Sequence, residues 1–180
     1  MANSQRAGRN NALLIVTALF VMAWATTASA GEATTSPDEA YLDALRGTWD
    51  MAGSFGGTPV RYNAEGQRVL QGGFLRLHMI DATSPPQYEA DVFIGFDHKA
   101  NDYVAHWLDR FGAAGARVVA RGVREGQRLV LTFPYAEGAF RDTFNWQPTT
   151  QSWSLLLESQ AVDGTWSTFA SYTLTRRAKH

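Results

Sequence analysis

The chain has 180 residues, of which 16 are basic, 17 are acidic and none is cysteine, so its formal net charge at pH 7 is −1. Scattered charge of this size gives no electrostatic reason to bind nucleic acid or an anionic membrane. Without cysteine the chain can form neither a disulfide nor a lipid anchor through a cysteine, so we expect its stability to come from its hydrophobic core.

The first thirty residues are typical of a secretory signal peptide. Arg6 and Arg9 form a basic region, the apolar run "ALLIVTALFVMAWA" follows over 12–25, and residues 28–30 form an A-x-A cleavage pattern. A membrane anchor is the alternative, but the run is shorter than the roughly 18 residues that a spanning helix needs. We expect cleavage after Ala30, a periplasmic or secreted location, and no membrane span in the mature chain.

A polar linker and a short helix precede the main domain. The linker is "GEATTSP" at 31–37. Within it Ser36 is a suitable helix N-cap and Pro37 suits the first helical position, with acidic residues in the first turn. Gly47 should end the helix. We assign residues 38–177 to one domain and residues 178–180 to a basic tail.

After Gly47 the apolar period changes to two, as in half-buried strands. Nearly every connection is of hairpin length, which favours an up-and-down order over a Greek key. About ten strands in one domain must close on themselves or stack as two sheets. We predict an all-β, closed, up-and-down antiparallel barrel. The predicted strands are 48–55, 60–62, 68–81, 88–96, 103–111, 117–123, 128–133, 140–146, 153–160 and 166–176.

In each strand the face with more large apolar groups should point inward, because burying that face removes the most apolar surface from water. In "YVAHWLDRFG" (103–112) this rule points Trp107 and Asp109 inward and His106 and Arg110 outward. Such an aromatic inward set can fill a small barrel or line a cavity. Our leading hypothesis is a cavity for a small hydrophobic or amphipathic ligand. Its predicted lining is Trp49, Tyr103, Trp107, Asp109, Phe140, Trp146, Trp166 and Tyr172.

Two carboxylates, Asp109 and Asp142, fall on these aromatic faces. A buried carboxylate is costly unless it is paired, and a raised pKa is what a general acid or base needs. Structural roles explain the two carboxylates as well, and we favour them: Asp109 could cap the loop that follows it, and Asp142 could pair with Arg76 if that side chain reaches inside. An isomerase or hydrolase that uses Asp109 or Asp142 is therefore one alternative to a binding barrel. A structural barrel with no ligand is another.

The sequence contains no motif for a metal or a cofactor. Its four histidines, His78, His98, His106 and His180, are scattered, and no pair has the spacing of a zinc-protease helix. There is no Gly-x-Ser-x-Gly elbow. The glycine-rich "GSFGG" leads into another strand and not into a helix, so it is not a phosphate loop. We therefore expect no metal and no cofactor.

Five blocks resemble the bacterial domain-of-unknown-function family 1579, in the family's order. They are "LDALRGTWD" (42–50), "RVLQGGFL" (68–75), "YEADVFIGFD" (88–97), "YVAHWLDRFG" (103–112) and "SYTLTRR" (171–177). The resemblance implies a lipocalin-like closed barrel, similar in outline to nitrobindin and fatty-acid-binding barrels. It supplies no activity and no catalytic residues. The matching positions include Trp107 and Asp109, whereas His106 and Asp91 depart from the family's pattern.

The opening Gly-Thr-Trp is also similar to that of the haem-binding nitrobindins. Their haem ligand is a histidine near the C-terminal strands. The corresponding part of this chain has no histidine before His180. The resemblance therefore does not imply haem binding of that kind.

Overall fold

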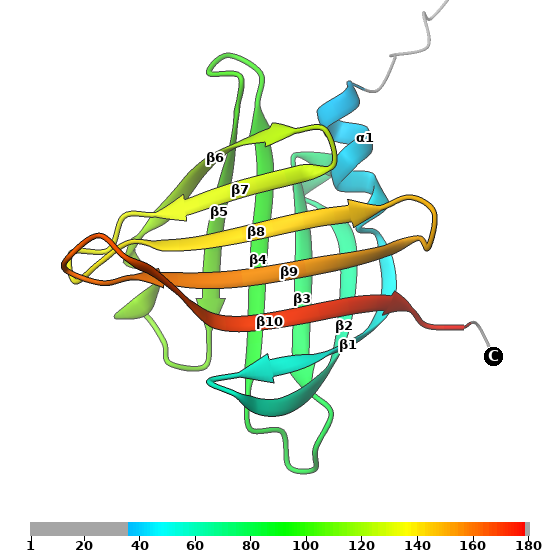
Figure 1. The fold of residues 1–180 in the computed structure, drawn as a ribbon. Coiled ribbons are helices and arrows are strands. Elements are labelled where there is room, and N and C mark those ends of the chain that lie inside the picture. Colours follow the sequence, from blue (N-terminus) through cyan, green and yellow to red (C-terminus); the bar gives the residue numbers. More distant parts are fainter. Residues whose placement is uncertain (1–35, 179–180) are drawn as a thin grey trace, which may run out of the picture. The chain divides into compact units, whose positions relative to one another are not determined.

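The computed structural model describes residues 36–178, which form one α-helix, two short 3₁₀ turns and ten strands (Figure 1). The expected signal peptide, its cleavage site and nearly all of the expected linker lie outside these residues. The helix α1 spans Pro37–Ala44. The strands are β1 (Gly47–Phe55), β2 (Thr58–Val69), β3 (Phe74–Asp81), β4 (Glu89–Asp97), β5 (Asp102–Asp109), β6 (Val119–Glu125), β7 (Arg128–Phe133), β8 (Phe140–Gln147), β9 (Ser152–Gln160) and β10 (Trp166–Arg176).

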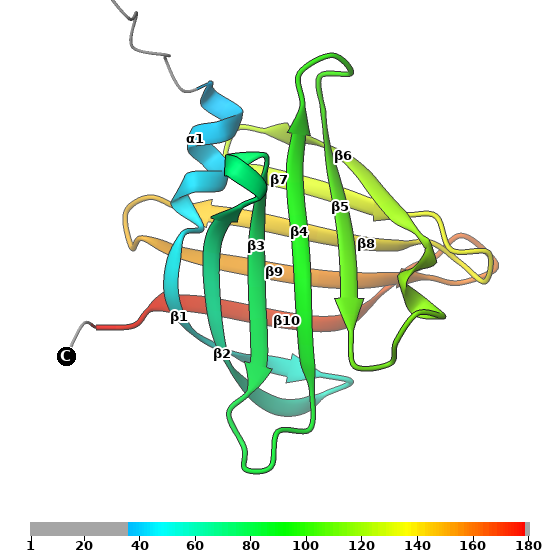
Figure 2. The same cartoon turned by 180° about the vertical axis from the view of Figure 1, so that it is seen from behind.

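The ten strands form one closed antiparallel barrel, seen from two sides in Figures 1 and 2. Each strand pairs with its neighbours in the sequence, and β10 closes the barrel by pairing with β1. The predicted fold class and the up-and-down order are confirmed. None of the helices within residues 36–178 is long and apolar enough to cross a membrane.

The inward faces follow the alternation that the sequence predicts. Leu75 and Leu77 of β3 and Leu129 and Leu131 of β7 are almost completely buried. On β4, whose facing was ambiguous from the sequence, Ala90, Val92 and Ile94 are buried. The core is therefore built from alternate residues of neighbouring strands, as expected for a sheet with one face inside and one outside.

Helix α1 covers one end of the barrel. Its predicted N-cap is confirmed, because Ser36 Oγ accepts a hydrogen bond from the Glu39 amide at 3.1 Å. The hydroxyl of Tyr41 donates to the carbonyl oxygens of Gln127 at 3.2 Å and Phe144 at 3.0 Å. These bonds attach the helix to the β6–β7 turn and to β8.

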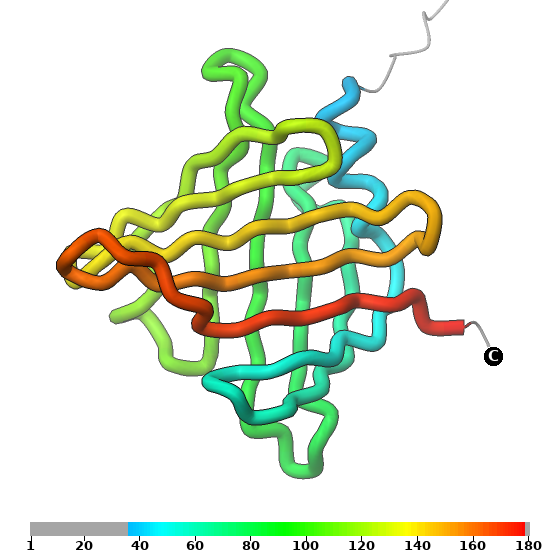
Figure 3. Tube along the Cα trace, viewed as in Figure 1, coloured from blue at the N-terminus to red at the C-terminus, as the bar shows by residue number. Residues whose placement is uncertain are grey.

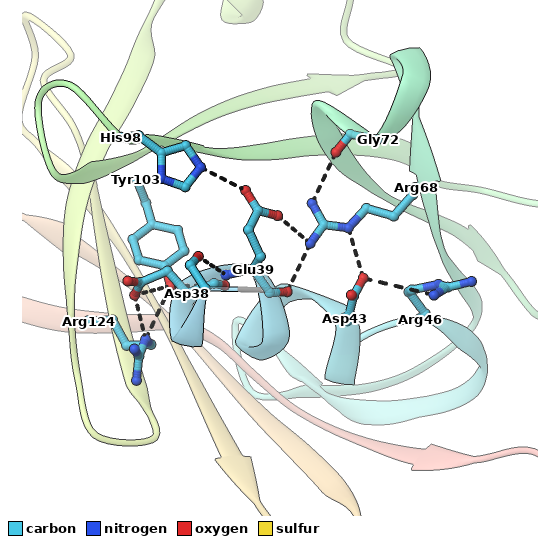
Figure 4. A network of polar contacts seen from close by, with 10 residues as sticks. Asp38, Glu39, Asp43, Arg46, Arg68, Gly72, His98, Tyr103 and Arg124 are labelled. Atoms are coloured by element: carbon cyan, nitrogen blue, oxygen red, sulfur yellow. Dashed lines mark hydrogen bonds and ion pairs between the residues drawn. The ribbon is translucent and has the colours of Figure 1, made fainter. Parts of the chain in front are cut away.

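Ion pairs reinforce the closed end (Figure 4). Arg68 of β2 lies 2.6 Å from the carboxylate of Glu39 and 2.8 Å from that of Asp43. Arg124 of β6 lies 2.9 Å from Asp38. The helix is therefore held by charges from two strands that are far apart in the barrel order.

The structure corrects the predicted strand boundaries around Gly66. The sequence predicts two separate strands, 60–62 and 68–81, but β2 runs through Glu65 and Gly66 without a break. The chain reverses instead at Leu70 and Gln71, whose φ angles are 52° and 58°. Gly66 is needed for a different reason: a Cβ there would lie 2.1 Å from the backbone oxygen of Leu45. This glycine permits a close approach of the segment after α1, and it marks no turn.

A bulge in β10 corrects the facing of Trp166. The register of β10 against β9 shifts between Thr168 and Ala170, so the alternation reverses at Phe169. Trp166 therefore lies on the outer face, with the Arg141 guanidinium 4.2 Å from the centre of its ring. Its predicted inward position is wrong, whereas Tyr172 lies on the inner face as predicted.

Candidate functional site

The barrel holds a cavity of about 710 Å³ at the end away from α1. Its rim is formed by the strand ends and loops of the β1–β2, β3–β4, β5–β6, β7–β8 and β9–β10 connections, whose paths can be followed in Figure 3. The two ends of the barrel therefore differ: the helix fills one, and the other is hollow. The aromatic residues of the lining are Phe55, Tyr62, Tyr88, Trp107, Phe111, Phe133, Tyr135, Phe140, Phe169 and Tyr172.

Edge-to-face contacts connect these rings. Phe169 packs against Phe55 with the ring centres 4.9 Å apart and against Phe140 at 5.1 Å. Tyr62 contacts Tyr172 at 5.7 Å. At the rim Phe111 is 74% exposed and Phe55 is 46% exposed. Large apolar side chains exposed around an opening are typical of a binding site.

Asp142 of β8 lies inside the hollow end. It is 3% exposed, lines the cavity and stands between Leu131 and Leu157 on the neighbouring strands. Among the described residues its carboxyl group has no hydrogen-bond or ion-pair partner. Burial raises the pKa of Asp142 from 3.8 to about 8. The group is therefore mostly protonated at neutral pH, in contrast to an exposed aspartate.

Asp109 of β5 has both of the placements that the sequence left open. It lines the cavity, and its Oδ1 caps the following loop by accepting from the Phe111 amide at 3.0 Å. Its Oδ2 accepts a hydrogen bond of 3.4 Å from the Tyr88 hydroxyl, whose oxygen accepts from Trp107 Nε1 at 3.1 Å. Burial raises the pKa of Tyr88, so its hydroxyl stays protonated.

Half of the predicted lining residues lie at the cavity: Trp107, Asp109, Phe140 and Tyr172. The other four do not, which corrects the expectation that all eight share one lining. Trp49 donates to the Leu45 carbonyl oxygen at 2.8 Å, and Tyr103 donates to Asp38 at 2.8 Å, both at the closed end. Trp146 packs against Trp153, and Trp166 is outside. Alternation assigns a residue to a face of the sheet but does not give its position along the barrel axis. The sequence prediction therefore did not separate residues of the closed end from residues of the cavity.

Several residues of the cavity lining were not predicted from the sequence. Tyr88 and Tyr135 lie just outside strands, and Phe169 occupies the β10 bulge. An aromatic residue beside a Pro- or Gly-containing loop was the available signal for Tyr88 and Tyr135. Phe169 gave no such signal, because the bulge that turns it inward arises from the pairing of β10 with β9.

Arg76, the suggested partner of Asp142, lies with His78 on the outer face of β3. Arg76 lies 2.6 Å from Asp91, and His78 Nδ1 lies 2.9 Å from the same carboxylate oxygen. Burial opposes ionisation of Asp91, but hydrogen bonds from Arg76 and His78 outweigh it and lower its pKa. Arg76 therefore does not reach Asp142, and that suggested pairing is wrong.

The described residues contain no group of three or more histidine, cysteine or acidic side chains that could hold a metal ion. His106 lies on the outer face as predicted, with Nε2 2.7 Å from the Ala116 carbonyl oxygen. The chemistry available in the cavity is therefore that of carboxyl groups, phenols and aromatic rings.

Comparison with solved structures finds a similar barrel in the crystal structure of Rv2717c from M. tuberculosis. The TM-score is 0.54 at 15% sequence identity, and the match covers 79% of this chain and 99% of that chain. At this identity the likeness shows the fold alone. No family model matches the chain, and no curated protein matches it. The comparison supports the ten-strand antiparallel barrel, and membership of family 1579 stays a hypothesis from the sequence blocks.

Proposed function

We propose that this chain is an exported protein whose barrel binds a small hydrophobic or amphipathic molecule in the cavity. The export part rests on the sequence pattern of residues 1–30, which the structure does not describe. The binding part rests on the described barrel, and one observation carries it: the end away from α1 holds an aromatic-lined cavity of about 710 Å³.

The dimensions and the lining both support binding. Ligand sites in proteins are typically concave, mostly apolar and roughly 300–1,000 Å³ in volume, with a few polar groups that orient the ligand. Here Asp142, Asp109 and the Tyr88 hydroxyl are such groups among aromatic walls. Burying about 200 Å² of apolar ligand surface would contribute on the order of 5 kcal/mol before the cost of association.

The closed end makes the cavity a pocket with a floor. Leu42 of α1 and Trp49 of β1 are almost completely buried where the helix meets the barrel, and ion pairs of Arg68 and Arg124 hold α1 in place. A ligand would therefore enter and leave through the loop end. This arrangement suits storage or transport of one molecule better than passage through the barrel.

Ligand binding can be tested with the neutral fluorescent probe N-phenyl-1-naphthylamine and with native mass spectrometry of protein purified from the periplasm. We expect saturable probe binding at one site. The variant Ser159→Trp places an indole at the cavity lining on β9 and should abolish it. The control Ser154→Trp adds the same group on the outer face of the same strand and should bind like the unaltered protein.

Two results would contradict the proposal. One is a protein that binds no probe and carries no molecule on native mass spectrometry or solvent extraction. The other is a Ser159→Trp variant that is folded by circular dichroism and binds the probe as tightly as the Ser154→Trp control.

A second function, acid–base catalysis, is favoured by one observation. Asp142 is buried without a partner among the described residues, and its raised pKa of about 8 suits proton transfer at neutral pH. Carboxyl-carbon NMR titration, with Asp142→Asn to assign the signal, tests this role. A midpoint near 4 for Asp142 would remove its physical basis and leave simple binding.

A further inference from the structure

The ionisable groups of the cavity lining are all acidic or phenolic. The carboxyl groups are Asp109, Glu137 and Asp142, and the phenols are Tyr62, Tyr88, Tyr135 and Tyr172. Within the described chain no lysine, arginine or histidine lines the cavity. An anionic ligand would therefore bury its charge beside carboxyl groups and without a cationic partner, which is unfavourable.

The two arginines next to Asp142 and Asp109 in the sequence do not line the cavity. Arg141, next to Asp142 on β8, points to the outer face and lies 2.8 Å from Glu158. Arg110, next to Asp109, donates to the backbone carbonyl oxygen of Gln87 and is not one of the lining residues. Neither side chain supplies a positive charge to the cavity.

Asp142 provides independent evidence for the sign of the ligand's charge. It is only 3% exposed and lines the cavity, and its carboxyl group has no hydrogen-bond or ion-pair partner among residues 36–178. Asp142 presents its oxygens to the cavity, because the one fully buried and unpaired side-chain atom among these residues is Thr143 Oγ1. A cationic group placed beside Asp142 would provide the missing partner and would form a charge-assisted hydrogen bond.

The walls favour the same kind of ligand. Aromatic rings attract cations through the negative charge above their faces, and each such contact adds roughly 0.5–2 kcal/mol depending on burial. Trp107, Tyr172 and Phe140 offer ring surface in the same cavity as Asp142. An apolar body would pack on these rings while its charged end meets the carboxylate.

We propose that the ligand is an amphipathic cation, an apolar molecule with a protonated amine that lies beside Asp142. This inference rests on the proposed binding function and names its ligand class. It separates this cavity from one that would select fatty acids, whose carboxylates need a basic residue.

Binding of such a cation would release a proton. Asp142 is protonated in the free protein at neutral pH, and an ammonium group beside it favours the ionised form. The tyrosines that face the cavity stay neutral, since burial raises the pKa of Tyr62, Tyr88, Tyr135 and Tyr172. Asp109 and Glu137 are the other acids of the lining. We expect the affinity for the cation to rise up to about tenfold from pH 6 to pH 7.

Three probes of equal chain length test the inference by isothermal titration calorimetry: decylammonium, decanol and decanoate. We expect decylammonium to bind about tenfold more tightly than decanol, and decanoate to bind most weakly. Titrations in buffers with different ionisation enthalpies should show release of close to one proton with decylammonium and none with decanol.

Matched variants assign the effect to Asp142. Asp142→Asn should abolish both the preference for decylammonium and the proton release, with the affinity for decanol unchanged. Asp50→Asn makes the same substitution at a side chain that is 60% exposed on the outer face, and it should keep both. A folded Asp142→Asn protein that retains the preference would show that Asp142 is not the partner.

The outcomes distinguish the two proposals without relying on any variant. If none of the three probes binds, the proposed binding function fails for this ligand size. If decanol or decanoate binds the unaltered protein as tightly as decylammonium, binding stands and the cationic ligand class is wrong.

Discussion

The indole Nε1 of Trp107 donates a hydrogen bond of 3.1 Å to the hydroxyl oxygen of Tyr88. The same hydroxyl donates to Asp109 at 3.4 Å. In the sequence Trp107 and Asp109 stand two residues apart on one strand face. The structure places a tyrosine from the β3–β4 connection between them, so this part of the cavity wall is organised by a residue from another part of the chain.

This bridge predicts the effect of Tyr88→Phe. Without the hydroxyl, Trp107 Nε1 loses its acceptor and Asp109 loses a donor, so we expect the free energy of unfolding to fall by about 1–2 kcal/mol in urea titrations. Tyr135→Phe is the control, since its hydroxyl donates to the Gly115 carbonyl at 3.3 Å in an exposed position. Its cost should stay below about 0.5 kcal/mol. Equal costs would show that the bridge does not stabilise the fold.

Asp142 should make the protein less stable as the pH rises. Its pKa is about 8 in the folded state against an ordinary 3.8. Between these values the folded state keeps a proton that the unfolded state has lost. The free energy of unfolding should therefore fall by roughly 1 kcal/mol for each pH unit from pH 5 to pH 8.

Asp142→Asn isolates that contribution, because asparagine does not titrate. Urea titrations at pH 5, 6 and 7 should show the variant gaining stability over the unaltered protein with each step. Other carboxyl groups contribute equally to both proteins and cancel. Parallel curves for the two proteins would mean that Asp142 is ionised in the folded state at these pH values.

The ion pairs of α1 should stabilise the closed end. Arg68 is 16% exposed and contacts two carboxylates of the helix, so Arg68→Met should lower the free energy of unfolding by roughly 2 kcal/mol. Arg46→Met is the matched control. Arg46 is 60% exposed and lies 4.0 Å from Asp43, so its loss should cost less than about 0.5 kcal/mol. A result with the two variants equally stable would argue against a stabilising role for the Arg68 pairs.

Gly66 should tolerate no side chain. In Gly66→Ala the new Cβ would lie 2.1 Å from the Leu45 backbone oxygen, so β2 and the segment after α1 must separate. We expect a loss of about 3 kcal/mol in thermal or urea unfolding. Gly115→Ala meets no atom within 4 Å and should change stability by less than about 1 kcal/mol. A Gly66→Ala protein as stable as the Gly115→Ala control would refute the close approach.

The sequence by itself determined the barrel, because the patterns that predict this fold are local. Period-two alternation, hairpin-length connections and the Ser36-Pro37 helix start are properties of neighbouring residues, and all three are found in the structure. Alternation also placed Asp142 on an inner face, where it is 3% exposed. A residue's face follows from its backbone position, which the pleat of a strand sets.

Only the tertiary structure decided how far along the barrel each inner residue lies, which distant residues contact each other, and where the alternation breaks. Trp49 and Tyr172 share the inner surface, yet one packs at the closed end and the other lines the cavity. Trp166 faces outward because β10 bulges against β9, and the strand position 66 requires a glycine because the segment after α1 approaches it closely. These features depend on contacts between segments that are distant in the chain. The local pattern of residues therefore contains no signal for them.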